Sequence, residues 1–305
     1  MRARPKTTPA IDAMLDGLVG HIDKCLDAYE DFGRRTRWEA QPGSPFEYET
    51  GRLRRHIGPG RHWNGTEANR AAVISTLFTQ QAAEHLEAVQ SLIKERQVTF
   101  SIAPLTRSIV ELCGHVYWLL DPSLMDNPRG RAARVFLAEL DDATKRASAA
   151  KAFEHPDTEQ IVKFKKALRQ EVLPVLFYPS EIEFDERSGA LVRLCKQSKP
   201  GLSASLRFIE NAIAQDVVTP GMYGYLSNAT HPTPYIVEEV YRWDEAQGRG
   251  YFVLPEARNP YALTRLAVVA FTLMWQVIAA YRGLDQQEAV DLAIEIDTLP
   301  SPPPE

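Results

Sequence analysis

The feature that most constrains the fold is a charge-free apolar stretch, residues 266–281, with Arg265 before it and Arg282 after it. A helix that crosses a bilayer needs about 20 apolar residues, and this stretch is shorter. A helix that is apolar on every side is normally buried inside a protein. The stretch therefore predicts a core helix with other elements packed around it, and no membrane span.

Most of the chain carries apolar residues at helical spacing. In residues 11–29, for example, Leu15, Leu18, Ile22 and Cys25 fall on one helical face. Similar signals predict helices over residues 66–96, 101–120, 127–151, 157–172, 186–197, 203–215, 220–230, 261–282 and 286–296. Residues 235–254 instead contain two β-branched and aromatic runs around a glycine-containing turn, which is typical of a β-hairpin. We therefore predict an all-α fold, a single multi-helix bundle domain with a minor β-hairpin.

The predicted domain covers residues 1–296, because no repeat and no strong linker divides the chain. Within it, residues 32–65 are rich in glycine, proline and arginine and predict an irregular basic loop or arm. Residues 297–305 form a proline-rich end that predicts a disordered tail.

Composition excludes several classes of protein. The 305 residues carry a net charge of −5, which argues against a nucleic-acid binder with a basic surface throughout. Cys25, Cys113 and Cys195 are far apart, as expected for reduced thiols in the cytoplasm and not for a disulfide framework or a zinc site. The chain contains no phosphate-binding loop, dinucleotide motif, zinc-protease motif or nucleophile elbow, so we predict no metal and no cofactor.

The most informative segment is the predicted helix over residues 101–120. Arg107, Glu111 and His115 are spaced four residues apart, and Gly114 and Trp118 lie beside them on the same face. Because the rest of this helix is apolar, we expect it to be buried, with its charged groups paired or bound to a ligand. One interpretation is a structural ion pair that fixes the helices in register. The other is a site in which Arg107 binds an anion while Glu111 or His115 moves a proton; a metal held by Glu111 and His115 is a weaker alternative, because no third ligand is evident.

A second group of polar residues lies near a predicted helix end. Tyr223 and Ser227 share a helical face, and His231 follows where proline stops the helix. Such side chains often satisfy backbone groups at helix ends. The alternatives are a ligand contact by Tyr223 or His231 and a Ser227–His231 nucleophile pair, which would lack an orienting acid.

Basic residues gather in two places. The first contains Arg52, Arg54, Arg55, His56, Arg61, His62 and Trp63, and the second contains Arg129, Arg131 and Arg134. Both sets could be solvated surface, could bind phosphate, sulfate or carboxylate groups, or could bind nucleic acid with Trp63 stacking on a base. Arg131 and Arg134 lie three apart in a predicted helix, so both could face one ligand.

These residues also carry a family resemblance. Arg107, Glu111 and residues 118–122, followed by Arg131, Arg134, Tyr223, Leu226, Ser227, His231 and Pro232, resemble a set of largely uncharacterised actinobacterial helical proteins and, more distantly, the HEPN-like helical families. The resemblance covers residues 66–235 and implies a helical fold. No histidine here follows an arginine by five residues, which is the tightest spacing of the HEPN ribonuclease signature, so the resemblance implies a non-catalytic module that binds a protein or RNA partner.

A fainter resemblance is to antibiotic-biosynthesis enzymes that close an aziridine ring by expelling sulfate. It implies arginines that hold the leaving sulfate and a Glu111 or His115 that deprotonates the attacking amine.

Our leading hypothesis is a cytoplasmic, cofactor-independent enzyme acting on a small anionic metabolite. Glu111, His115 and His231 are its predicted catalytic residues, and the predicted substrate-binding residues are Arg107, Trp118, Arg131, Arg134, Tyr223 and Ser227. The HEPN-like binding module is the rival. Both hypotheses allow a second copy of the chain or a small partner subunit to take part.

Overall fold

The structure is a computed structural model. It describes residues 8–96, 101–187, 190–200, 207, 226–227, 241–244, 249–252 and 258–299. Its main helices are α1 (Pro9–Thr36), α2 (Pro45–Arg54), α3 (Thr66–Lys94), α4 (Ile102–Leu120), α5 (Pro128–Ala152), α6 (Thr158–Ala167), α7 (Leu173–Leu176), α11 (Arg258–Arg282) and α12 (Gln287–Glu295). The strands are β1 (Ile182–Phe184), β2 (Leu191–Leu194), β3 (Tyr241–Asp244) and β4 (Arg249–Phe252).

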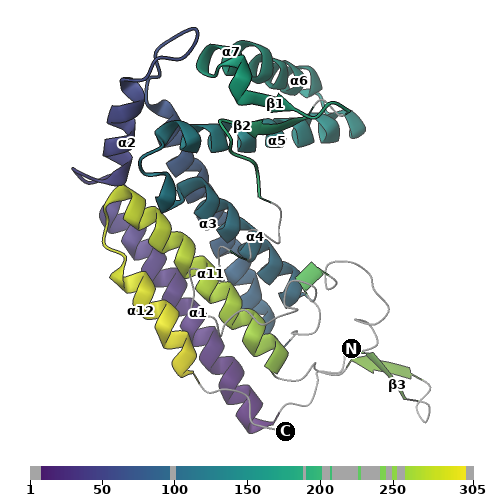
Figure 1. The fold of residues 1–305 in the computed structure, drawn as a ribbon. Helices are drawn as coiled ribbons and strands as arrows, with labels where there is room; N and C mark the ends of the chain where they lie inside the picture. Colours follow the sequence, from purple (N-terminus) through teal and green to yellow (C-terminus); the bar gives the residue numbers. More distant parts are fainter. Residues whose placement is uncertain are drawn as a thin grey trace.

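The fold is an all-α helical bundle with minor β-hairpins (Figure 1). The predicted core helix is confirmed as α11, which packs against α4, α3, α1 and α12. Its side chains Phe271, Met274, Trp275 and Ile278 have no exposed surface. The α11 segment Pro260–Arg282 is long and apolar enough to cross a membrane, yet 78% of its most apolar window is buried inside the protein, as in a core helix.

Helix starts follow from capping chemistry. The side chain of Thr8 accepts a hydrogen bond from the backbone N–H of Ile11, and Pro9 occupies the first turn of α1, where a missing N–H has no effect. At α5, the side-chain oxygen of Asn127 accepts a hydrogen bond of 2.9 Å from the backbone N–H of Gly130. The predicted helices over residues 66–96, 101–120 and 127–151 agree closely with α3, α4 and α5, although the residue just before each of α3 and α4 makes no side-chain capping hydrogen bond.

The prediction of an irregular arm over residues 32–65 was wrong in its central part. Residues 45–54 form α2, because Ser44 caps it, Pro45 opens it and Arg52 and Arg54 lie in its last turn. The following loop is also ordered against the protein. Gly60 N–H donates to the carbonyl of Val175 over 2.9 Å, and a side chain at Gly58 would meet the carbonyl oxygens of Val175 and Leu176. Trp63, at the end of the loop, is only 2% exposed.

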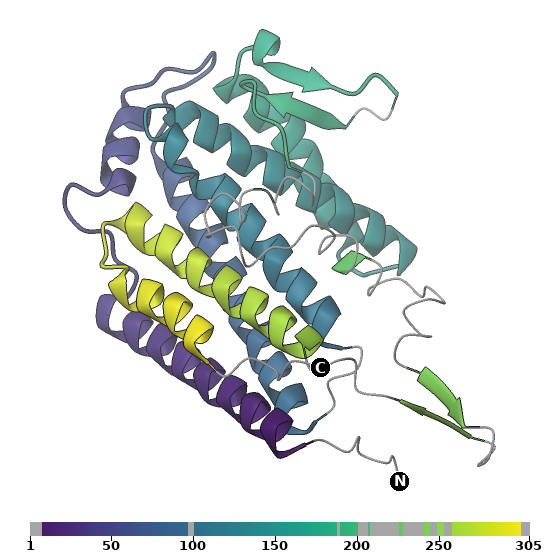
Figure 2. The same ribbon diagram turned by 60° about the horizontal axis from the view of Figure 1, so that its bottom comes forward.

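The predicted helix over residues 186–197 was also wrong, because this segment contributes to a β-hairpin. Strands β1 and β2 pair antiparallel, with Ile182 opposite Leu194, and Leu194 is buried in the core. Strands β3 and β4 pair antiparallel as predicted, with Tyr241 opposite Phe252. Figures 1 and 2 show the β1–β2 hairpin with α2, α6 and α7 at one end of the bundle and the β3–β4 hairpin beside the other end.

The C-terminal prediction needs a smaller correction. Residues Ile296–Thr298 form a 3-10 turn, Arg265 pairs with Asp297, and Leu299 packs against the core. Residues 300–305 and most of the predicted helices at 203–215 and 220–230 lie outside the described residues; Leu226 and Ser227 are helical, and Leu226 belongs to the core.

Candidate functional site

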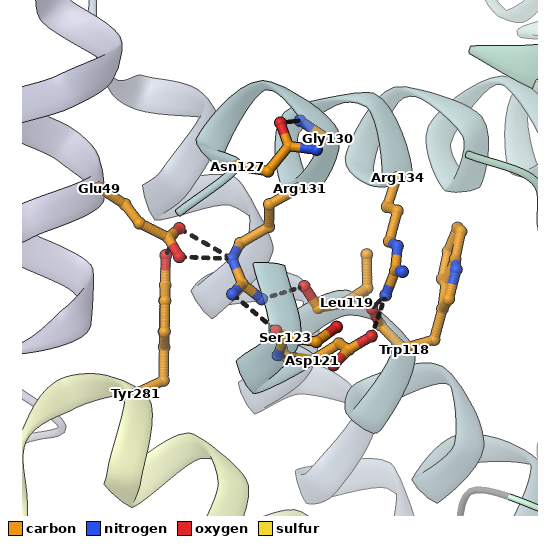
Figure 3. Close-up of polar contacts among 10 residues, drawn as sticks. All are labelled: Glu49, Trp118, Leu119, Asp121, Ser123, Asn127, Gly130, Arg131, Arg134 and Tyr281. Carbon is orange, nitrogen blue, oxygen red and sulfur yellow. Dashed lines mark hydrogen bonds and ion pairs between the residues drawn. The ribbon is translucent and has the colours of Figure 1, made fainter. Parts of the chain in front are cut away.

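Two arginines of α5 hold the end of α4 in place (Figure 3). Arg131 is 2% exposed and donates from Nε to both carboxylate oxygens of Glu49, over 2.9 and 2.8 Å. Its other nitrogens donate to the carbonyls of Leu119 (2.7 Å) and Asp121 (3.0 Å), which lie at the C-terminal end of α4 and just beyond it. The arginine therefore supplies the donors that the last carbonyls of a helix lack.

Glu49 is the carboxylate that completes this cluster. It has no exposed surface, and it accepts a third hydrogen bond, of 2.9 Å, from the hydroxyl of Tyr281 on α11. Burial raises the pKa of Glu49, while Arg131 and Tyr281 act in the opposite direction by stabilising the ionised form. The Arg131 guanidinium also lies 5.0 Å from the centre of the Tyr281 ring. Glu49, Arg131 and Tyr281 thus link α2, α5 and α11.

Arg134 makes a second connection of the same kind. It donates to the carbonyl of Trp118, to the carboxylate of Asp121 over 3.1 Å and to the side chain of Gln197 over 2.8 Å. Its guanidinium lies 5.6 Å from the centre of the Trp118 ring, and Trp118 is 3% exposed. Burial raises the pKa of Asp121, but hydrogen bonds from Ser123 and the charge of Arg134 lower it overall.

The structure therefore corrects the expectation that Arg131 and Arg134 face one open ligand site. Their donors point into the protein, at the carbonyls and carboxylates shown in Figure 3. Trp118 is enclosed with them and offers no open face to a ligand.

The polar stripe of α4 is in a different environment. Arg107 donates from Nε to Glu111 over 2.8 Å, and their side chains are 21% and 40% exposed. The expectation that α4 is buried is confirmed for most of the helix, which α3 and α11 cover, while the face of Arg107 and Glu111 is half-buried. An ion pair this open contributes only a few tenths of a kcal/mol, too little to fix the register of the bundle.

His115 lies on the same stripe among charges from other elements. Its ring centre is 6.0 Å from that of Phe78 on α3. Burial, followed by the positive charge of Lys199, lowers the pKa of His115 to about 4, although Glu111 acts in the opposite direction. The imidazole is therefore neutral at pH 7 and has a nitrogen able to accept a proton.

Two further groups near His115 come from α5. Asp141 pairs with Lys199, and it also accepts from Lys145 over 3.0 Å. Burial raises the pKa of Asp141, but the hydrogen bonds from Lys199 and Lys145 lower it overall, so the carboxylate is ionised. Asp141, Lys145 and Lys199 were not predicted from the sequence, where the i, i+4 spacing of Asp141 and Lys145 is the only local signal for them.

Of the second predicted group, the structure describes only Ser227, which is half-buried and helical; Tyr223 and His231 lie outside the described residues. Their convergence with Glu111 and His115 stays a prediction. Among the described residues, no group of three or more histidine, cysteine, aspartate or glutamate side chains could hold a metal ion.

Fold and site together define an all-α bundle protein with a half-buried, charged face on one of its central helices. The chain matches no protein-family model, and no curated protein or solved structure is significantly similar to it.

Proposed function

We propose that this protein is a cytoplasmic, cofactor-independent enzyme that acts on a small anionic metabolite by acid–base chemistry. The observation that supports it is the setting of His115, a neutral imidazole with Glu111 one helical turn away and Lys199 and Asp141 contributed by other segments. Titratable groups with strongly shifted pKa values are enriched at active sites.

The charge around this imidazole suits an anion. Arg107, Lys145 and Lys199 are the described cations of the face, and Glu111 and Asp141 are its described carboxylates, so these five side chains carry one excess positive charge. An arginine and a lysine could hold a departing oxyanion while Glu111 or His115 removes a proton. His231, Tyr223 and Ser227 of this same chain stay predicted contributors.

The reaction class that fits both roles is displacement of an oxyanion by a neighbouring amine. The amine nitrogen forms a bond to the adjacent carbon, the carbon–oxygen bond to sulfate breaks, and sulfate leaves with the electron pair. The proton lost by the nitrogen passes to Glu111 or His115. The protein would accelerate this step by orientation and by charge stabilisation of the leaving group.

The test uses 2-aminoethyl hydrogen sulfate, which would close to aziridine and release sulfate. We expect the wild-type protein to release sulfate above the uncatalysed rate. Glu111→Gln is expected to lower that rate about 100-fold, as removal of a general base does. Sulfate is measured by ion chromatography, and thermal unfolding shows whether each variant is folded.

The control is Glu84→Gln, which removes an exposed carboxylate from α3 and should leave sulfate release unchanged. Absence of release by the wild-type protein, or equal rates for wild type and Glu111→Gln, would contradict the proposed reaction. A Glu111→Gln protein that is unfolded as well as inactive would instead support a structural role for the Arg107–Glu111 pair.

A binding module for RNA is the second candidate, and one observation favours it. Arg54, Arg55, Arg61 and His62 are exposed at the end of α2 and in the loop that follows. Trp63, in contrast, is buried and cannot stack on a base without leaving the core. If the module binds RNA, the affinity for a single-stranded oligonucleotide should fall steeply with added salt and should weaken in Arg55→Gln. Absence of binding, or an affinity that does not change with salt concentration, would contradict an RNA-binding function.

A further inference from the structure

A cavity of about 420 Å³ lies away from the α4 face, between the start of α5 and the β1–β2 hairpin. Its lining includes Arg129 of α5, Ser180 and Glu181 before β1, and Arg193 and Lys196 of β2 and the following turn. Cavities that hold small molecules measure about 300–1,000 Å³, so this one is large enough for a small metabolite.

The walls of the cavity are fixed by hydrogen bonds. Cys195 N–H donates to the carbonyl of Glu181 over 2.9 Å, and Leu194 and Gln197 exchange backbone hydrogen bonds across the turn that carries Lys196. Arg134 holds the side chain of Gln197 over 2.8 Å, which joins this turn to α5. A ligand would therefore meet groups that are already in position.

The charges that line the cavity leave a positive excess. Arg129 pairs with Glu181 over 2.6 Å, and Arg193 pairs with Glu183 over 3.0 Å. Lys196 is exposed and has no carboxylate partner among the described residues. An incoming oxyanion would find in Lys196 a cation that is not already neutralised.

Arg129 forms one wall of the cavity and packs against buried aromatic rings. Its guanidinium lies 5.9 Å from the centre of the Trp63 ring and 6.0 Å from that of Phe177, both buried side chains. Its Nε–H is buried without a hydrogen-bond partner in the described part of the chain. Because this N–H is enclosed by the protein, Arg129 contributes its positive charge to the cavity and not this donor.

We propose that this cavity binds a small metabolite that carries an oxyanion group, a carboxylate or a phosphate, through Lys196, with Arg193 and Arg129 adding positive charge to its wall. Ser180 adds a hydroxyl to the same lining. The site is separate from the proposed acid–base site on α4, because none of its lining residues belongs to the group around His115.

The test is isothermal titration of the full-length protein with two probes, inorganic phosphate and succinate. We expect saturable binding of at least one probe, and the stronger of the two identifies the oxyanion. Lys196→Met should weaken that binding at least fivefold. Lys151→Met is the matched control, because Lys151 is exposed at the opposite end of α5, about 33 Å from Arg129 at 1.5 Å per residue.

The proposal is supported if Lys196→Met weakens the saturable binding and Lys151→Met changes the affinity less than twofold. No saturable binding of either probe, or equal weakening by the two variants, would overturn it. Sulfate release is measured in parallel, and Lys196→Met should leave it unchanged. The outcome at this cavity is therefore distinguishable from the outcome at the α4 face.

Discussion

Replacing Arg131 with methionine is expected to destabilise the protein by about 3–5 kcal/mol. The substitution leaves Glu49 without its ion-pair partner at a site with no exposed surface, and removal of one member of a buried pair has costs of this size. It also removes the donors to the carbonyls of Leu119 and Asp121 at the end of α4. Methionine is unbranched and replaces the aliphatic stem of arginine, but it lacks the guanidinium, so the lost contact with the Tyr281 ring adds to the expected effect.

The measurement is the free energy of unfolding from urea denaturation at pH 7. Arg146→Met serves as the control, because Arg146 is 63% exposed and lies 3.8 Å from Asp142 in an open i, i+4 pair. We expect a change below about 0.5 kcal/mol for that variant. The double variant Glu49→Gln/Arg131→Met should recover part of the loss, since it no longer buries an unpaired charge. A loss below about 1 kcal/mol in the single variant would show that the buried pair is not the link that the geometry indicates.

The sequence predicted the long helices well because their signals are local. A capping residue and a proline in the first turn stand next to each other at the start of α5, and a charge-free stretch marks α11. Residues 45–54 were missed although Ser44 and Pro45 are a standard start, because the surrounding glycine, proline and arginine residues outweighed that signal. Residues 191–194 form a strand because they pair with residues 182–184. The periodicity of a single segment cannot predict such a partner.

The candidate site shows the same division between local and distant information. The shared face of Arg107, Glu111 and His115 depends only on helical spacing, and it is present in the structure. The role of Arg131 depends on Glu49, which lies 82 positions away, and on Tyr281, which lies 232 positions from Glu49. Spacing alone made Arg131 and Arg134 equally plausible as ligand-binding residues, whereas their buried partners assign both to the support of α4.

That support bears directly on the proposed chemistry. Arg131 and Arg134 fix the last turn of α4 and the residue after it, and α4 carries Arg107, Glu111 and His115 on the turns before. Acid–base groups that act by orientation need a backbone that does not move relative to the other walls of the site. The buried arginines therefore belong to the proposed site as positioning residues.

His115 should make the stability of the protein depend on pH in a defined direction. In the folded protein its pKa is about 4, against an ordinary value of 6.5. As pH falls below 6.5, the unfolded chain takes up a proton at this residue that the folded protein binds only near pH 4. The stabilisation of the folded protein by the neutral imidazole is therefore complete above pH 6.5 and is lost as pH falls through 4. At about 1.4 kcal/mol per pH unit, the loss between pH 7 and pH 4 is about 3 kcal/mol.

Urea denaturation of the wild-type protein and of His115→Gln at both pH values isolates this contribution. Other groups titrate in both proteins and cancel in the comparison, so the wild type should lose about 3 kcal/mol more than the variant between pH 7 and pH 4. His62→Gln, which replaces an exposed histidine, should behave as the wild type does. Equal losses in wild type and His115→Gln would mean that the imidazole is solvated and not held neutral by burial and Lys199, and the proton acceptor proposed for the α4 face would then have to be Glu111 alone.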